Sequence, residues 1–274
     1  MHKVNFLIYF YIIIAIFICS FFIIKLNEKT VDIRDFKKDI LLVPEKVELE
    51  AKSFLVYDIN EKKIVLSKNE NEILPLASLS KVVSLSAYLE FTKNNNLKDI
   101  DIKKKELIDK ILIESSNDAM NILGKEFKFF YKKDLIEETN IFLKSKEINN
   151  MQFVNLTGLD LDKEKPSNLG SAKSIAEVYI YFYENYNFLF QDTKFDKIGK
   201  LENTNKDSDK TFGLLSSKTG FTDIAGGNLI IISSPTPDKK YIIVVLGSSR
   251  EGRFSDIKKL NNILPFLPKM QANP

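Results

Sequence analysis

The sequence has 274 residues but only one cysteine, Cys19, and one histidine, His2. A single cysteine excludes an intramolecular disulfide and a thiolate metal cluster, and a single histidine excludes a zinc site with several histidine ligands. Ser-His-Asp or Cys-His catalysis within one chain would require His2 to fold back from the N-terminus. A catalyst built on this chain must therefore use serine, lysine, tyrosine or carboxylate groups.

An excess of one charge is also missing, because 40 Lys and Arg face 37 Asp and Glu, for a net charge of +3. Nucleic-acid binders usually carry a one-sided basic excess, so we expect no nucleic-acid partner. The hydrophobic fraction of 44% is sufficient for a large core. The length favours one or two domains.

Charged residues are absent from Val4 to Ile24, a run long enough to cross a bilayer core of about 30 Å. A cleaved signal peptide usually has a shorter apolar region and a small-x-small cleavage site, and this run lacks a clean one. We therefore expect residues 1–26 to form a transmembrane signal-anchor, with a cleaved signal peptide as the alternative. Lysines after the run favour a cytoplasmic body by the positive-inside rule.

Beyond this run, residues 27–50 are charged and are predicted to form a linker before a compact domain at 51–268 and a short tail at 269–274. Strands are expected at both ends of the domain, at Ser53–Asp58, Lys62–Ser67, Gly227–Ser234 and Lys240–Leu246. Helices are expected between and after them, at 79–92, 104–114, 119–130, 134–145, 171–185 and 254–264. This order predicts an α+β fold in which the two ends of the chain close an antiparallel sheet around a helical insertion. The Lys, Asn and Asp runs at 93–105 and 202–210 are predicted to be solvated loops.

The first of three candidate motifs is Ser78-Leu-Ser-Lys81, at the start of a predicted helix. Residues three apart lie on the same helix face, so the Lys81 amine can lie beside the Ser78 hydroxyl. A serine needs a base to become a nucleophile, and a desolvated lysine can be neutral enough to act as one. A helix cap followed by a surface lysine is the structural alternative.

The second motif is Ser115-Ser-Asn117, between two predicted helices. In an extended turn, both side chains can point into one cleft, where Ser115 could relay a proton and Asn117 could bind a substrate carbonyl. An ordinary helix-helix turn with a cap at Ser116 or Asn117 is the structural alternative.

The third motif is Lys218-Thr-Gly220, followed by Phe221. Leading toward a strand, it places an ammonium and a hydroxyl at a sheet edge, where Lys218 and Thr219 could hold a substrate carboxylate. Gly220 would let a substrate lie against the backbone, and the next amide could serve an oxyanion hole. A glycine turn with a surface lysine is the structural alternative.

Together, the order and spacing of these motifs resemble the penicillin-recognising serine acyltransferases. Flanking segments narrow the resemblance to the low-molecular-weight penicillin-binding proteins, and within them to the serine D-alanyl-D-alanine carboxypeptidases. The segments are Ala51–Asp58, Leu76–Lys81, Ser116–Ala119, Phe153–Asp160, Lys218–Thr222, Ala225-Gly226 and Val245–Ser248. The resemblance covers nearly all of the chain from 51 to 267.

This resemblance implies a β-lactamase/transpeptidase-like fold, a five-stranded antiparallel sheet with an inserted helical subdomain. It implies that Ser78 attacks a D-Ala-D-Ala stem peptide of peptidoglycan, releases the terminal D-Ala, and is acylated by β-lactam antibiotics. The implied base is Lys81. Ser115 would pass the proton to the leaving amine, and Lys218 would tune this transfer electrostatically. The amides of Ser78 and Phe221 would form the oxyanion hole, and neither a metal nor an organic cofactor is needed.

The resemblance is less complete at two positions. A family arginine that holds the substrate carboxylate corresponds to Arg253, just before the last predicted helix, and a second corresponds to Thr204. Carboxylate binding is therefore expected to rest on Lys218, Thr219 and Arg253. A turn-setting proline is replaced in Asn155-Leu-Thr-Gly158.

Since stem peptides lie outside the cytoplasmic membrane, the implied location is a single-pass membrane protein with an extracytoplasmic catalytic domain. Long domains translocate largely regardless of flanking charge, which outweighs the lysine bias. A serine β-lactamase on the same fold is the rival enzyme, although Glu137-Glu-Thr-Asn140 resembles its deacylating motif only superficially. A catalytically silent, membrane-anchored cell-wall-binding protein is the other alternative.

Overall fold

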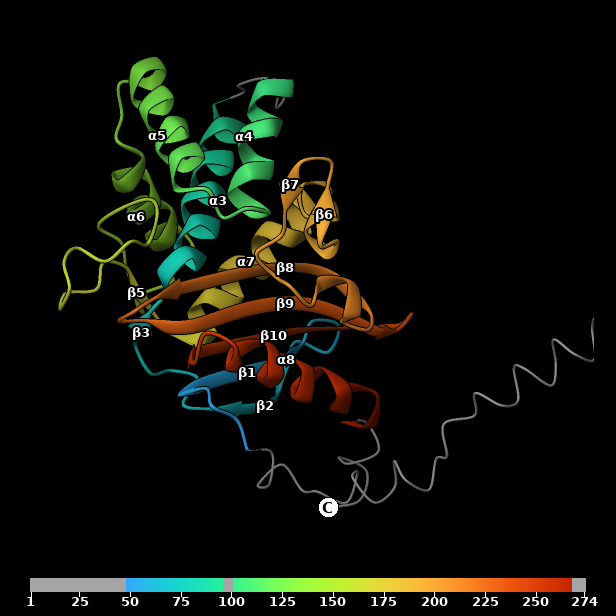
Figure 1. Cartoon of the computed structure of the whole chain (residues 1–274). Helices are drawn as coiled ribbons and strands as arrows, with labels where there is room; N and C mark the ends of the chain where they lie inside the picture. The colour runs from blue at the N-terminus through green and yellow to red at the C-terminus, as the bar shows by residue number, and fades with distance from the viewer. Residues whose placement is uncertain (1–47, 96–100, 268–274) are drawn as a thin grey trace, which may run out of the picture. The chain divides into compact units, whose positions relative to one another are not determined.

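A five-stranded antiparallel sheet organises the chain in a computed structural model that describes residues 48–95 and 101–267. The strand order is β2-β1-β10-β9-β8, so the first and last strands of the domain meet at its centre (Figure 1). The strands are β1 (Ser53–Asp58), β2 (Lys63–Lys68), β8 (Leu214–Thr222), β9 (Gly226–Thr236) and β10 (Lys239–Ser248). The predicted closure of the sheet by both ends of the chain is confirmed.

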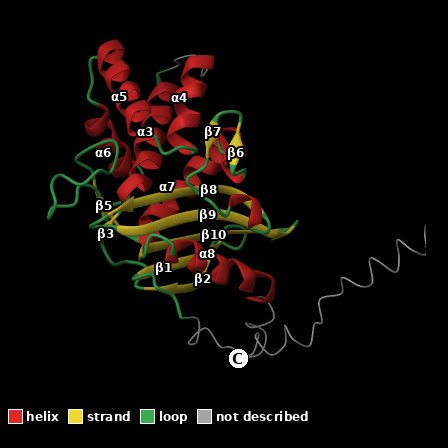
Figure 2. Cartoon of the chain, viewed as in Figure 1, coloured by secondary structure: helices red, strands yellow, loops and turns green. Residues whose placement is uncertain are grey.

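Helices cover both faces of this sheet, as Figure 2 shows. On one face, α7 (Ala172–Tyr186) packs against β1 and β10, and on the other α8 (Gly252–Ile263) packs against β9 and β10. The remaining helices gather on the β8 side of the sheet (Figure 1). They are α3 (Ser80–Asn94), α4 (Ile102–Leu112), α5 (Asn117–Tyr131) and α6 (Leu135–Ser145).

The strands alternate their side chains between two hydrophobic cores. Leu55 and Val244 belong to the core shared with α3 and α7, whereas Val56 and Ile243 belong to the core under α8. Successive residues of a strand point to opposite faces, so strands buried on both sides read as continuous apolar runs. The run Ile230-Ile-Ile232 in β9 is of this kind, with all three side chains fully buried.

Most predicted elements are present with ends shifted by a few residues, and β1 matches its predicted range. Three small elements complete the part that carries the site: β3 (Leu74–Pro75), β4 (Met151–Gln152) and β5 (Leu169–Gly170) pair as one sheet. Two others, β6 (Lys197–Ile198) and β7 (Leu201–Glu202), form a short hairpin.

The prediction of a solvated loop at 202–210 is wrong in part. Asn205 and Ser208 are buried, and the segment ends in a short 3-10 turn, Ser208–Lys210. The Asn205 side chain accepts a hydrogen bond from the Asp207 amide, and the Asn203 side chain accepts one from the Asn205 amide. Local hydrogen bonds between side-chain amides and the backbone therefore satisfy polar groups of this segment.

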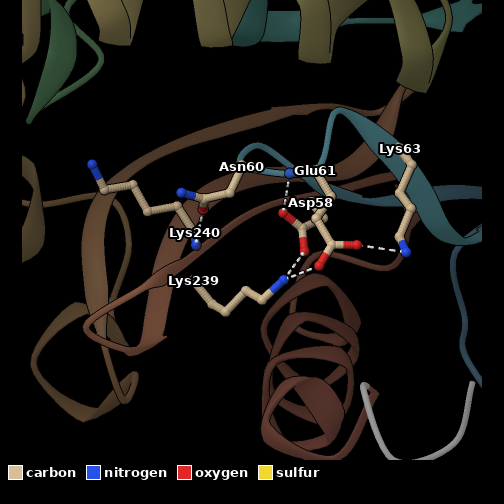
Figure 3. A network of polar contacts seen from close by, with 6 residues as sticks. All are labelled: Asp58, Asn60, Glu61, Lys63, Lys239 and Lys240. Atoms are coloured by element: carbon tan, nitrogen blue, oxygen red, sulfur yellow. Dashed lines mark hydrogen bonds and ion pairs between the residues drawn. The ribbon is translucent and has the colours of Figure 1, made fainter. Parts of the chain in front are cut away.

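A polar network joins the turn between β1 and β2 to the turn between β9 and β10 (Figure 3). The Lys239 ammonium lies 3.2 Å from the Asp58 carboxylate and also binds Glu61, which in turn pairs with Lys63 at 2.6 Å. The Asn60 side chain accepts a hydrogen bond from the Lys240 amide at 2.7 Å. These contacts fasten one end of the sheet, where two sequence-distant hairpins meet.

The predicted transmembrane run at 4–24 lies outside the described residues. Within the described ranges, none of the helices is both long and apolar enough to span a bilayer.

Candidate active site

Ser78 lies in a 3-10 turn, η2 (Ala77–Leu79), immediately before α3. Lys81, in the first turn of α3, is fully buried, and its Nζ lies 2.7 Å from Ser78 Oγ and 2.9 Å from the Thr157 carbonyl oxygen. The predicted Ser-Lys pair is therefore formed, and Thr157 supplies a second acceptor that the motif did not indicate.

The turn that carries the nucleophile is strained and is held by packing. Ala77 has φ of +47°, a left-handed conformation that costs a non-glycine residue roughly 1–3 kcal/mol. Gly158 packs against it so closely that a Cβ at position 158 would lie 1.8 Å from the Ala77 carbonyl oxygen. Glycine at 158 is thus required for the close approach of these two segments.

The environment of Lys81 makes it a competent base. Burial lowers the pKa of its amine to about 7, because the charged form is desolvated. Near neutral pH, a large fraction of Lys81 is then unprotonated, with a lone pair that can accept the Ser78 proton.

Ser115 and Lys218 form the second pair of the site. Lys218 Nζ lies 2.7 Å from Ser115 Oγ and 2.8 Å from the Thr219 carbonyl oxygen. Burial lowers the pKa of the Lys218 amine well below its usual value, and the charges of Lys81 and Arg253 lower it further. A hydrogen bond therefore joins the second and third motifs, and the charge of Lys81 couples the third motif to the first.

The Ser115 turn differs from the extended conformation that we expected. Ser115 itself has φ of +58°, and Ser116 is the N-cap of α5, accepting a hydrogen bond from the Ala119 amide. Asn117 is the first residue of α5, and its buried Oδ1 has no hydrogen-bond partner among the described residues.

Lys218-Thr-Gly220 lies within β8, the edge strand of the sheet, rather than ahead of a strand. A Cβ on Gly220 would lie 3.2 Å from the Ser78 nitrogen and 2.9 Å from the Leu76 carbonyl oxygen. The glycine therefore serves the close packing of β8 on the nucleophile's turn, and its contact with substrate stays a prediction. It brings the strand that carries Phe221 beside the backbone of Ser78.

Thr204 binds directly to the third motif, from the segment that was predicted to be a solvated loop. Thr219 Oγ1 donates a hydrogen bond to Thr204 Oγ1 at 2.6 Å, and the Thr204 amide donates to the Ile113 carbonyl at 3.1 Å. Thr204 thus bridges β8 and the end of α4, two walls of the site. The sequence signal was its place in the family pattern, where the expected arginine is missing.

Arg253 is the second residue of α8, and its side chain is buried. Its Nη1 donates to the Gly220 carbonyl at 2.6 Å, and its guanidinium carbon lies 6.0 Å from the centre of the Phe221 ring. Burial lowers the pKa of Arg253 to about 10. The group is a fixed cation beside β8.

The segment that superficially resembles a β-lactamase motif lies on α6 and does not supply a free buried carboxylate. Glu137 is exposed, and the Glu138 carboxylate binds Lys133 at 2.6 Å. The Asn140 amide donates to the backbone carbonyls of Ile136 and Phe153. The contacts of Glu138 and Asn140 are therefore structural, and the likeness to the β-lactamase motif is superficial, as predicted.

Two curated proteins are similar to this chain in sequence. In a curated relative, the D-alanyl-D-alanine endopeptidase of Escherichia coli (strain K12), 22% of 254 aligned residues are identical, covering 78% of this chain and 76% of the relative. The D-alanyl-D-alanine carboxypeptidase DacF of Bacillus subtilis (strain 168) is 26% identical over 231 residues, which are 73% of this chain and 58% of DacF.

Solved structures share the fold. Penicillin-binding protein D2 from Listeria monocytogenes, in its ampicillin-bound form, superposes with a TM-score of 0.68 and 25% identity. The match covers 80% of this chain and 98% of that protein. The family model described as Peptidase_S11, D-alanyl-D-alanine carboxypeptidase, matches residues 86–250. Since that match spans more than half of the chain, the protein belongs to the D-alanyl-D-alanine carboxypeptidase family.

Proposed function

We propose that this protein is a serine-type D-Ala-D-Ala carboxypeptidase that removes the terminal D-Ala from peptidoglycan stem peptides through a Ser78 acyl-enzyme. The observation that carries the proposal is the contact of 2.7 Å between Lys81 Nζ and Ser78 Oγ, in a site where the lysine is fully buried. This arrangement activates a serine without histidine, as the composition of the chain requires.

Acylation begins when neutral Lys81 takes the Ser78 proton and Ser78 Oγ attacks the carbonyl carbon of the scissile D-Ala-D-Ala bond. The oxyanion of the tetrahedral intermediate forms near the Ser78 and Phe221 amides, which β8 brings close together. The proton then passes to the leaving amine through Ser115, whose hydroxyl is held by Lys218. Water hydrolyses the ester in the reverse sense, with Lys81 again as the base.

The cations of the site suit a peptide that ends in a carboxylate. Lys218 and Arg253 are buried, and Thr219 lies at the same edge of the sheet. A substrate carboxylate would offset the cost of burying these positive charges. Asn117, at the start of α5, would bind a substrate carbonyl. β-Lactam antibiotics would acylate the same Ser78 as covalent inhibitors.

The proposed location is the outer face of the cytoplasmic membrane, with residues 4–24 as a single-pass anchor in the bilayer. The uncharged run in the sequence supports the anchor, and the location of stem peptides supports the orientation.

Labelling with a fluorescent penicillin tests the function. Wild type is expected to form a covalent adduct on Ser78 and to release D-Ala from a pentapeptide, and Ser78→Ala is expected to lose both activities. A label that maps to another serine would contradict the mechanism. Rapid loss of the label would instead indicate a β-lactamase, and absence of any label would indicate a silent cell-wall-binding protein.

A further inference from the structure

Asn168 is a buried amide, 1% exposed, immediately before β5. Its Oδ1 accepts hydrogen bonds from the Val154 amide at 2.9 Å and the Asn155 amide at 3.2 Å, and its Nδ2 donates to the Asn155 carbonyl at 2.8 Å. One side chain therefore satisfies three backbone groups of the segment that leads to Thr157.

Asn155 extends this hydrogen-bond network to the next turn. Its Oδ1 accepts from the Thr157 amide at 3.1 Å and the Gly158 amide at 2.7 Å, which closes a turn by side-chain bonding. This is the turn that has Leu156 where the family pattern has proline, so the amides replace the constraint of a proline ring. The turn presents the Thr157 carbonyl to Lys81 Nζ at 2.9 Å.

Asn168 also binds the segment that carries Ser78. Its backbone carbonyl accepts the Leu76 amide at 3.0 Å, two residues before Ser78. Gly158, at the end of the Asn155 turn, packs on the Ala77 carbonyl of the same segment. The nucleophile's segment and the turn that contacts the base are therefore tied to one residue.

We infer that Asn168 is a positioning residue of the acylation step, which sets the direction of the Lys81 lone pair through Asn155 and the Thr157 carbonyl. A neutral lysine amine has one lone pair and two N–H bonds. When one N–H is fixed by the Thr157 carbonyl, the lone pair is restricted to directions that include Ser78 Oγ. A carbonyl achieves this without a negative charge, which would raise the Lys81 pKa and protonate the base.

This inference rests on the proposed function, and two substitutions at the same position test it. Asn168→Ala removes the three side-chain bonds to the backbone and a longer one, at 3.4 Å, to Asn155 Oδ1, and Asn168→Asp keeps the size and the acceptor oxygen but replaces the donor with a carboxylate. The matched control is Asn140→Ala, because the Asn140 amide also bonds the backbone of this segment, at Phe153, but does not reach the Asn155 turn. The full-length protein in detergent is acylated with a fluorescent penicillin from pH 5 to 10, and its melting temperature is measured.

We expect Asn168→Ala to lower the maximal acylation rate constant by roughly 10–100-fold at saturating penicillin, with little change in the half-saturating concentration. We expect Asn168→Asp to move the acid limb of the pH profile upward by about one pH unit, because the new carboxylate stabilises the Lys81 ammonium. Asn140→Ala should keep the wild-type rate and profile.

The inference is overturned if Asn168→Asp has the wild-type pH profile, or if Asn168→Ala is folded and has the rate constant of Asn140→Ala. If Asn168→Ala does not fold, the profile of Asn168→Asp decides alone. Failure of the proposed function has a different signature, since wild type itself would then not be acylated.

Discussion

Three buried cations, Lys81, Lys218 and Arg253, dominate the chemistry of the site at the scale of single residues. None of them takes part in an ion pair within the part of the chain that the structure describes. Desolvation is therefore the largest effect on all three groups, and the pKa of each is lowered. A lysine base and a site attractive to anions both follow from this single physical cause.

The pKa of Lys81 predicts the pH dependence of acylation. Because only the neutral amine can accept the Ser78 proton, the acylation rate constant should be half-maximal near pH 7 and fall about tenfold for each pH unit below it. Lys81→Arg should lower the plateau roughly 10³-fold or more, since a guanidinium stays protonated. Stopped-flow labelling with a fluorescent penicillin measures both effects, and Lys93→Arg at the other end of α3 is the control. A profile that is flat between pH 5 and 8 would exclude Lys81 as the titrating base.

Arg253 provides a second prediction at this scale, for substrates with a free terminal carboxylate. Losing a charge-assisted hydrogen bond costs about 1.5–3 kcal/mol, so Arg253→Ala should lower kcat/KM for D-Ala-D-Ala peptides roughly 10–100-fold. Penicillin acylation should suffer less, because the strained ring supplies reactivity that the peptide must obtain from positioning. The control is Arg250→Ala, which removes the exposed neighbour that stacks on the same Phe221 ring. Equal losses for both substrates would mean that Arg253 acts only through the Gly220 carbonyl.

At the scale of elements, the site depends on backbone contacts that side-chain patterns do not reveal. The turn before α3 is held by Gly158 and faces Gly220 of β8, so three segments meet with almost no space between their backbones. Close packing of this kind transmits displacement, and a side chain at either glycine would move the nucleophile.

The two hairpins joined by Lys239 yield a prediction about stability. Contacts with Lys239 and Lys63 lower the pKa of Glu61 from 4.5 to about 2. A carboxylate stabilises the fold when its pKa is lower in the folded protein than in the unfolded chain. This contribution is complete above the pKa of the unfolded chain, and it is lost as the pH falls through the pKa of the folded protein. Because the pair is exposed and screened by solvent, Lys239→Met should lower the melting temperature only slightly at pH 7, and the difference from wild type should shrink between pH 4.5 and 2.

The control for this prediction is Lys240→Met. The Lys240 side chain points away from the network, and only its backbone amide is used (Figure 3). Differential scanning calorimetry checks both variants. A difference that stays constant down to pH 2 would show that Lys239 stabilises the turn by packing alone.

At the scale of the whole molecule, the site lies where the edge strand β8 meets the helical part of the domain. β8 brings Lys218, the η2 turn brings Ser78, and the loop between α4 and α5 brings Ser115. An edge strand has hydrogen-bonding groups that are free to pair with an extended peptide, which suits a peptide substrate.

The sequence before the domain leads to a prediction about the intact protein. If residues 4–24 anchor the chain, the protein should sediment with membranes, resist extraction by alkaline carbonate, and retain its N-terminal residues on sequencing. External protease should degrade the domain in cells from which the wall has been removed. Recovery of a mature form cleaved near Ser20 would establish the cleaved signal peptide instead.

Local sequence was enough for four strands of the sheet, most of the helices and the three motifs, whereas the fifth strand, β8, was implied only by the resemblance. Alternating or continuous apolar runs specify strands such as β1 and β9, since burial of one or both faces depends on residue order alone. The spacing of Ser78 and Lys81 fixes their contact, because three residues along a helical turn bring two side chains to one face.

Tertiary structure alone decided the contacts between segments that are far apart in the chain. The Lys81–Thr157 bond, the Thr219–Thr204 bond and the buried place of Arg253 join residues from separate elements. The left-handed backbone of Ala77 and Ser115 was likewise invisible, because neither residue type prefers it. Local propensity cannot encode such features, since they persist only where packing from other segments outweighs their conformational cost.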